Sequence, residues 1–290
     1  MSRISPAQFR EQFSEVLDPS DEVVVVYSGI WTFGHQFGLP IRDVPRMLIE
    51  QMLEAVGSDR TLVLPSYTYA YAGKRSYSPQ ESLPETGVLP QAYWRQFPVT
   101  RTESALNSFL AIGPRAHLLA PIRGRTLWGE GSLKAAFQSM HARMVTLGIA
   151  WKESLGFLHR IEEAGNVPYR YHKTFHGQWV ERGEASPWSE TMYVRSIDLL
   201  PVFAWERVDR LLRSRSRVRK ASGSVFIESA DAADIVAAGL EIIADDPYAL
   251  MVNVDEVRAW VREGKAAEIE ALRAREPAAL EHHDQMAQQA

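Results

Sequence analysis

The N-terminal half of the chain alternates between helically spaced apolar residues and short, continuous apolar runs. Residues 5–17 place their apolar side chains on one helical stripe, and Ser5 followed by Pro6 predicts a capped helix start. The run VVVVY at 23–27 is typical of a strand buried on both faces. The same criteria predict strands over 61–69 and 144–150, helices over 43–56, 89–97 and 155–165, and a strand followed by a helix within 107–118. Because helices lie between the apolar strands, this order indicates βαβ units and an α/β fold.

The predicted secondary structure changes after residue 165. Antiparallel strands are predicted over 169–183 and 190–199, and amphipathic helices over 205–215 and 230–246. The sequence has no internal repeat and no Gly/Ser-rich linker that would separate the two halves. We therefore predict one α/β domain over 1–253, with an elaborated C-terminal half, followed by a charged, alanine-rich helical tail over 254–290.

A long loop is predicted over residues 70–88, which are rich in Gly, Pro, Ser and Tyr. Loops of this length in compact domains tend to carry function. Tyr67, Tyr69 and Tyr71 alternate where the second predicted strand enters this loop, so the pattern predicts that all three side chains face one side. Such a row of rings either lines a pocket or packs against the core, and the sequence favours neither reading.

Composition narrows the range of functions. With 290 residues, of which 46% are hydrophobic, the chain can bury a sizeable core. A formal net charge of −4 gives no sign of the basic face that nucleic-acid binders carry, so a small-molecule partner is favoured. The absence of cysteine excludes disulfides and thiolate nucleophiles. No apolar run approaches the ~18 residues that span a bilayer, so we expect a cytoplasmic protein that binds neither membrane nor nucleic acid.

Three other patterns carry weaker signals. Residues 124–132 are glycine-rich but lack the lysine of a phosphate-binding loop, which disfavours an ATPase. His172 and His176 have the spacing of metal ligands on a helix, but the residues around them alternate as in a strand and no third ligand is evident. We therefore expect no metal. The arginine-rich run at 210–220 is either a solvated helix face or a site for phosphate groups.

The segment SLGFLHRIEEAG at 154–165 places His159 and Glu162 three positions apart. On a helix these residues share a face, so the carboxylate can reach one nitrogen of the imidazole. That contact fixes the tautomer and raises the basicity of the ring, leaving the other nitrogen to remove a proton from a nucleophile. Such pairs are also common on exposed helix surfaces, so the spacing alone does not assign a function.

Several blocks of the sequence together resemble one family. Leu147 and Gly148, followed by Leu158, His159 and Glu162, match a strand ending in Leu-Gly and a later Leu-His-x-x-Glu motif. Further blocks agree in order and spacing at 23–34, 60–71, 85–116 and 127–137. Together they resemble the aminoglycoside N3-acetyltransferase family over about residues 20–240.

The resemblance implies a fold and an activity. It implies an α/β/α sandwich with a central mixed sheet, and transfer of an acetyl group from acetyl-coenzyme A to an amino group of an aminoglycoside or amino sugar. His159 would be the general base and Glu162 its orienter, which suits an amine that must lose a proton before attack. The role implied is antibiotic resistance, and a homodimer is a possible assembly.

The resemblance also suggests where the two substrates bind. Tyr67, Tyr69 and Tyr71 would line the site of the amine. Coenzyme A carries phosphates that favour arginines and helix N-termini. Its candidate contacts, near the first strand and the turn at 101–108, are Ser28, Thr68, Arg101, Ser104 and Ser108.

The chain departs from the family at two places. Gly156 and Phe157 stand where a threonine is common, so Ser154 or a backbone group would have to replace that hydroxyl. Ser104 and Ala105 stand where the family commonly has His-Pro.

These departures keep three other readings open. The amine could be biosynthetic and carry a phosphate or nucleotide, as the arginine-rich run suggests. The chain could bind coenzyme A or a sugar without turnover. It could also hydrolyse acyl esters with His159 and Ser28, Ser104 or Ser108, although it contains no Gly-x-Ser-x-Gly elbow.

Overall fold

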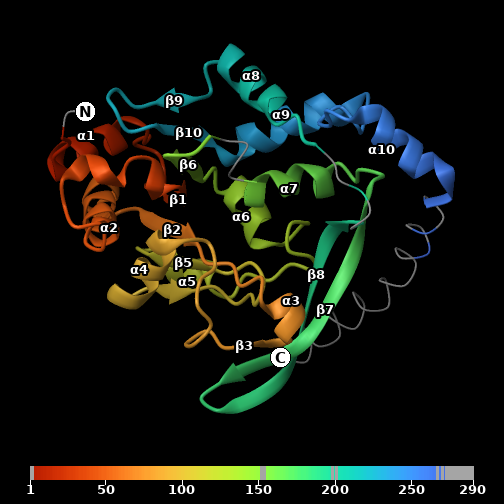
Figure 1. The fold of residues 1–290 in the computed structure, drawn as a ribbon, viewed down its shortest axis with the longest axis horizontal. Helices are drawn as coiled ribbons and strands as arrows, with labels where there is room; N and C mark the ends of the chain where they lie inside the picture. The colour runs from red at the N-terminus through yellow and green to blue at the C-terminus, as the bar shows by residue number, and fades with distance from the viewer. Residues whose placement is uncertain are drawn as a thin grey trace.

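A seven-stranded mixed sheet forms the centre of the protein (Figure 1). The computed structural model describes residues 3–150, 155–196, 199, 202–265, 268 and 271. The strand order is β4-β5-β2-β1-β6-β10-β9; β1 is parallel to β2 and β6, whereas β5 and β10 join antiparallel. The strands are β1 (Val23–Ser28), β2 (Thr61–Pro65), β4 (Thr100–Arg101), β5 (Phe109–Ile112), β6 (Arg143–Leu147), β9 (Arg219–Lys220) and β10 (Ile227–Asp231).

Helices cover both faces of this sheet because successive strand side chains point to opposite sides. In β1, Val24 and Val26 join the core under α1 (Pro6–Glu15), α2 (Val44–Val56) and α4 (Val88–Gln96). Val23 and Val25 join the core under α6 (Leu133–Ser139), α7 (Leu155–Ala164) and α9 (Ala232–Ala244). Figure 1 shows α1 and α2 to the left of the sheet and α6, α7 and α9 to its right. The predicted α/β/α sandwich with a central mixed sheet is confirmed.

The remaining helices are short or peripheral. They are η1 (Ile30–Thr32), η2 (Gly34–Phe37), α3 (Tyr71–Lys74), α5 (Ala116–Leu119), α8 (Glu206–Ser214), α10 (Val254–Trp260) and the π-helical turn η4 (Val261–Lys265). Among the described residues, no helix is both long enough and apolar enough to cross a membrane.

The helices predicted before residue 247 agree with the observed ones, with ends shifted by a few residues. The start of α1 shows the reason. Gln8 donates its backbone N–H to the Ser5 hydroxyl over 3.2 Å, and its side chain accepts the Ser5 backbone N–H over 2.9 Å. This reciprocal capping box is a local feature that the sequence specifies directly.

The second predicted strand is too long. β2 ends at Pro65 rather than at residue 69, and the chain then turns into α3. Ser66 and Thr68 still donate their backbone N–H groups to the carbonyls of Ser108 and Leu106. The segment is thus held against the turn after β4 without being part of a regular strand. The predicted loop over 70–88 contains α3 and the short strand β3 (Ser76–Tyr77).

A long hairpin runs from the right-hand side of Figure 1 down to the bottom of the picture, where its tip projects from the sandwich. It consists of β7 (Arg170–Glu181) and β8 (Glu184–Arg195), and β3 pairs in parallel with β7 to complete a three-stranded sheet. Arg182 and Gly183 form its turn with φ angles of 53° and 84°, as a two-residue type I′ hairpin requires. β8 begins six residues before the predicted 190–199 strand. The sequence pattern missed residues 184–189 because most of them are exposed and they lack an alternation of apolar and polar residues.

The predicted boundary at residue 254 stays a prediction. Val257 of α10 is fully buried in the same core as α7 and α9, and most of the predicted tail beyond Lys265 lies outside the described residues.

Candidate active site

His159 and Glu162 form a closely bonded pair on α7. The Nδ1 atom of His159 lies 2.6 Å from Oε2 of Glu162, whose side chain is completely buried. The other carboxylate oxygen, Oε1, accepts a hydrogen bond of 2.8 Å from Nε of Arg170 at the start of β7. Arg170 in turn donates to the backbone carbonyl of Tyr193 on β8, over 2.9 Å. The hairpin therefore fixes the carboxylate, and the carboxylate fixes the imidazole.

This geometry assigns the tautomer of His159. A carboxylate oxygen at 2.6 Å requires a proton on Nδ1, since two facing lone pairs would repel each other. The lone pair is then on Nε2, which no described residue engages. Burial, together with the Arg170 guanidinium, lowers the pKa of His159 although the Glu162 carboxylate raises it. The ring is thus neutral at neutral pH and able to accept a proton.

The charge of Glu162 is stabilised by its neighbours. Burial raises the pKa of the carboxyl, but the Arg170 guanidinium and the hydrogen bond from His159 outweigh it, so the pKa lies below its ordinary value. A buried carboxylate with both oxygens hydrogen-bonded is a stable orienting group for an imidazole.

Aromatic rings hold the imidazole from two sides. The Trp128 ring packs on His159 with centroids 4.7 Å apart, and Phe203 lies edge-on at 6.2 Å. The indole Nε1–H of Trp128 is buried and has no hydrogen-bond partner in the described part of the chain. A donor left unpaired beside the imidazole is available to a bound molecule.

A buried lysine lies against the ring of Trp128. Lys134, on α6, is 1% exposed, and its Nζ donates to the side-chain oxygen of Asn107. Nζ is 5.0 Å from the centroid of the Trp128 ring and 5.4 Å from that of Tyr67. Burial lowers the pKa of the Lys134 ammonium well below its ordinary value, although the Glu163 carboxylate raises it.

The three predicted substrate tyrosines do not share a face, which corrects the prediction from their alternation. Because β2 ends at Pro65, the period of a strand does not extend through them. Tyr67 is buried in the core beside α7, where its hydroxyl lies 2.9 Å from that of Tyr27. Tyr69 is 57% exposed, and Tyr71 is buried under the hairpin, donating to the carbonyl of Trp188.

Arg101, a predicted coenzyme contact, is bonded within the protein through all five of its N–H groups. The distances lie between 2.6 and 3.2 Å, and the acceptors are the hydroxyls of Ser108 and Thr68 and the carbonyls of Ser66, Pro79 and Ser82. A guanidinium has five donors, so none is left for a phosphate in this arrangement. The structure brings Arg101, Thr68 and Ser108 together, but in a network that joins the segment after β2, β4 and the loop at 78–82.

The other two predicted coenzyme contacts lie elsewhere. Ser28 ends β1, next to Leu147 at the end of β6, and thus lies at the carboxyl edge of the parallel strands. Ligands of α/β sheets commonly bind at this edge. The Ser104 hydroxyl accepts the backbone N–H of Asn107 within the turn after β4. Ser154 lies outside the described residues.

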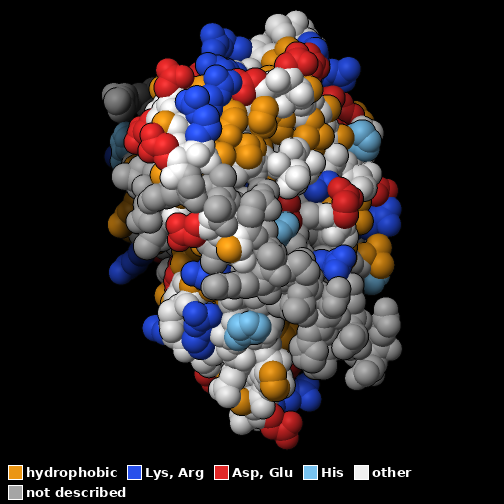
Figure 2. All heavy atoms as spheres, turned by 90° about the vertical axis from the view of Figure 1, so that its right-hand side faces the viewer, with side chains coloured by type: hydrophobic (Ala, Val, Ile, Leu, Met, Phe, Trp, Pro, Cys, Tyr) orange, Lys and Arg blue, Asp and Glu red, His pale blue; other side chains and the backbone are white. Residues whose placement is uncertain are grey.

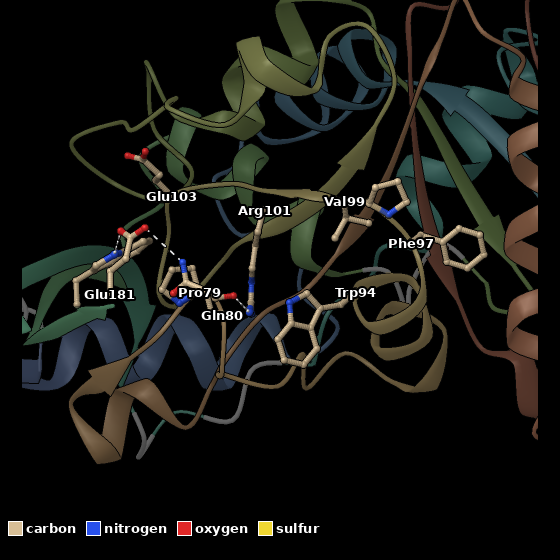
Figure 3. Close-up of a pocket in the computed structure, with 10 residues that line it drawn as sticks. Pro79, Gln80, Trp94, Phe97, Val99, Arg101, Glu103 and Glu181 are labelled. Atoms are coloured by element: carbon tan, nitrogen blue, oxygen red, sulfur yellow. Dashed lines mark hydrogen bonds between the residues drawn. The ribbon is translucent and has the colours of Figure 1, made fainter. Parts of the chain in front are cut away.

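A cavity of about 400 Å³ opens beside Arg101 (Figure 3). Figure 3 shows Arg101 between Pro79 and Gln80 on one side and Trp94 on the other. The cavity is lined by residues of the 78–82 loop, α4, β4 and the hairpin. No residue of α7 is part of this lining. The lining therefore contains neither His159 nor Glu162.

The structure shows the contacts of two of the three weaker sequence patterns. His172 bonds to Glu163 and His176 to Ser189, both from β7, and no described His, Asp and Glu side chains gather in a group of three that could hold a metal. Several arginines of the 210–220 run have acidic partners, in the pairs Arg213–Asp209, Arg215–Glu241, Arg217–Asp234 and Arg219–Asp18. These pairs favour an ion-paired surface over a phosphate site. Figure 2 likewise shows acidic and basic side chains interspersed on one face of the molecule.

Three residues at this site were not found from the sequence. Arg170 bonds to Glu162, Trp128 packs on His159, and Lys134 lies against the Trp128 ring; all three come from other elements, and only tertiary packing brings them there. The nearest sequence signal was the glycine-rich segment at 124–132, which contains Trp128.

Comparisons with solved structures identify the fold. The apoenzyme of aminoglycoside acetyltransferase AAC(3)-IVa aligns with a TM-score of 0.67 at 23% identity, covering 89% of this chain and 98% of that one. AAC-VIa bound to sisomicin aligns with a TM-score of 0.67 at 21% identity, covering 83% and 97%. AAC-IIIb in a binary complex with CoASH aligns with a TM-score of 0.68 at 17% identity, covering 84% and 97%.

Two comparisons used the sequence alone. None of the curated proteins compared with the chain matches it. A family model described as aminoglycoside 3-N-acetyltransferase matches residues 35–244, which is most of the chain. The chain therefore belongs to the aminoglycoside 3-N-acetyltransferase family.

Proposed function

We propose that this acyltransferase transfers the acetyl group of acetyl-coenzyme A to an amino group of an aminoglycoside or related amino sugar, with His159 as general base and Glu162 as its orienter. The observation that carries the proposal is the buried His159–Glu162–Arg170 chain, which leaves an unprotonated Nε2 on the imidazole. Family membership, the CoASH bound to AAC-IIIb and the sisomicin bound to AAC-VIa support the two substrates. A resistance role follows from this family. The homodimer and the cytoplasmic location stay predictions.

The reaction needs one proton removed and one negative charge stabilised. Nε2 of His159 takes a proton from the attacking amine as its nitrogen bonds to the thioester carbonyl carbon. The carbon–sulfur bond then breaks, giving the amide, and the leaving thiolate of coenzyme A takes up the proton from Nε2 of His159, which regenerates the neutral base. During attack Glu162 stabilises the imidazolium, because its carboxylate remains hydrogen-bonded to Nδ1–H.

The site contains donors suited to the developing oxyanion. The unpartnered indole N–H of Trp128 lies on the ring that packs against His159. The first backbone N–H groups of α7 have no partner within the helix, and they precede His159 on the same element. Such fixed donors stabilise a tetrahedral intermediate in a site from which water is excluded.

The alternatives are separated by one assay. Thiol release from acetyl-coenzyme A is measured with sisomicin-like polyamines, with phosphorylated amino sugars and without any amine. Release that depends on the polyamine supports the proposal. Release without amine indicates hydrolysis, and binding of coenzyme A without release indicates a silent homologue. Preference for the phosphorylated amine would overturn the substrate class proposed here. The ion pairs of the arginines at 210–220 already disfavour a phosphorylated substrate.

A further inference from the structure

Lys134 is a buried basic residue that the proposed mechanism does not use. Its side chain comes from α6, and its Nζ donates a hydrogen bond to the side-chain oxygen of Asn107. The ring centroids of Trp128 and Tyr67 lie 5.0 and 5.4 Å from the same nitrogen, and burial raises the pKa of Tyr67, so that phenol is uncharged. No carboxylate in the described ranges forms an ion pair with Lys134. Because a buried ammonium is costly without such a partner, its retention points to a role beyond packing.

The carboxylate that orients the base also opposes its function. Glu162 accepts from Nδ1 of His159 at 2.6 Å, which positions the ring but favours its protonated form. An imidazolium has no lone pair and cannot take a proton from an amine. Burial and Arg170 counteract this effect, but Arg170 is itself ion-paired with Glu162 over 2.8 Å, so much of its charge is neutralised there. A further, unpaired positive charge near the ring would keep it neutral over a wider range of pH.

Lys134 reaches the imidazole through the ring of Trp128 rather than through the carboxylate. The indole contacts both groups, since it packs on His159 with centroids 4.7 Å apart and lies 5.0 Å from the Lys134 Nζ. Like charges repel, so an ammonium at this position lowers the pKa of His159. Both side chains are buried, and water therefore screens the repulsion only weakly.

The charged groups that face these two residues come from α7 and β7. His159 faces the Glu162 carboxylate on its own helix and the Arg170 guanidinium from the hairpin. Lys134 faces the Glu163 carboxylate, which raises the pKa of the amine while burial lowers it. Falling pH favours the ammonium form of Lys134. Its charge is thus greatest on the acidic limb of activity, where His159 would otherwise gain a proton.

We propose that Lys134 is a positioning residue of the acetyl transfer, whose ammonium presents the positive charge that keeps the His159 imidazole unprotonated. In this role it acts through the imidazole and needs no contact with either substrate. The inference rests on the function proposed above and adds to it the residue that sets the acidic limit of activity. Loss of this charge extends the inactive range to higher pH, because His159 then gains its proton more readily.

The test removes the charge while keeping the shape of the side chain. Methionine is unbranched like lysine but uncharged, and it suits an apolar core. We measure the pH dependence of kcat with acetyl-coenzyme A and sisomicin for the wild type, Lys134→Met and Lys220→Met. We expect Lys134→Met to raise the midpoint of the acidic limb by about half a pH unit or more, with the plateau of kcat within about threefold. Lys220, an exposed lysine of β9 that also lies over a ring, that of Phe226, is the matched control and should leave the midpoint unchanged.

An unchanged midpoint in folded Lys134→Met would overturn the inference, and a lower plateau beside it would make the residue structural. Where Lys134→Met does not fold, Lys134→Gln takes its place, since a neutral amide can still donate to Asn107. NMR titration of the wild type requires no variant: it follows the Cε signal of Lys134 and the ring signals of His159. We expect Lys134 to be an ammonium at the pH at which His159 gains its proton, and a neutral amine at that pH would refute the proposal.

Failure of the proposed function gives a different result. If the wild type releases no thiol with any amine, the acetyl transfer is refuted, and the NMR titration of His159 still tests the charge on Lys134. A midpoint of the imidazole titration that is higher in Lys134→Met than in the wild type supports the electrostatic role. Equal midpoints contradict it.

Discussion

A side chain at Gly156 would collide with Tyr67: a Cβ atom there would lie 2.6 Å from the tyrosine hydroxyl oxygen and 3.0 Å from its ring. Tyr67 thus occupies the space that the threonine common in the family would need. Tyr67 is buried and its hydroxyl bonds to Tyr27, so the ring cannot easily move away. At position 156, the absence of a side chain is explained by packing of α7 against Tyr67, in the segment that follows β2.

This contact predicts the outcome of Gly156→Ala. Alanine ordinarily stabilises a helix by about 1 kcal/mol relative to glycine. Here we expect a net loss of about 1–3 kcal/mol in the free energy of unfolding, because the methyl group overpacks a rigid site. Urea denaturation measures it. A variant at least as stable as the wild type would contradict the contact, and in the Tyr67→Phe background the loss should be smaller.

Removing the orienting carboxylate should impair catalysis and stability together. Glutamine has one acceptor oxygen, so Glu162→Gln cannot accept from both His159 and Arg170. We expect kcat to fall about 100-fold and the free energy of unfolding to fall by about 3 kcal/mol, since Arg170 loses its buried partner. Steady-state kinetics and urea denaturation check the two effects. Unchanged kcat would show that Glu162 does not orient the base.

The pH profile should report the lowered pKa of His159. Burial and Arg170 favour the neutral ring, so the acidic limb of kcat for the wild type should have its midpoint below 6.5, the ordinary value for histidine. Activity from this group rises as pH increases through that midpoint and is then constant. Since Glu162 raises the pKa, Glu162→Gln should move the midpoint further down. A midpoint above 6.5 in the wild type would contradict this environment.

Arg101 provides a test between a structural role and coenzyme binding. Its five internal hydrogen bonds predict that Arg101→Lys lowers the free energy of unfolding by about 2 kcal/mol while the KM for acetyl-coenzyme A stays within about twofold. Denaturation and kinetics of one preparation measure both. A raised KM with unchanged stability would instead assign Arg101 to the coenzyme phosphates, as its sequence position suggested.

The sequence predicted those features that local chemistry determines. The apolar runs of β1 and β6, the capping box of α1 and the spacing of His159 and Glu162 each depend on a few consecutive residues. Features that depend on distant segments were missed. Arg170 reaches the site from the hairpin, and Trp128 from a loop whose glycines gave only a weak signal.

The tyrosine row shows how a correct local pattern can mislead. Alternation predicts a shared face only while the chain stays extended, and β2 ends at Pro65. The turn that follows separates Tyr67, Tyr69 and Tyr71 into a core position, an exposed position and a contact with the hairpin.

The most direct test of the central claim compares two histidines. Thiol release from acetyl-coenzyme A with an aminoglycoside is measured for the wild type, His159→Ala and His176→Ala, with folding checked by circular dichroism. His176 is a matched control, because it bonds to Ser189 on the hairpin and lies outside the proposed site. We predict amine-dependent release that falls at least about 100-fold in His159→Ala and is unchanged in His176→Ala. Full activity in a folded His159→Ala would contradict the assignment of His159 as the general base.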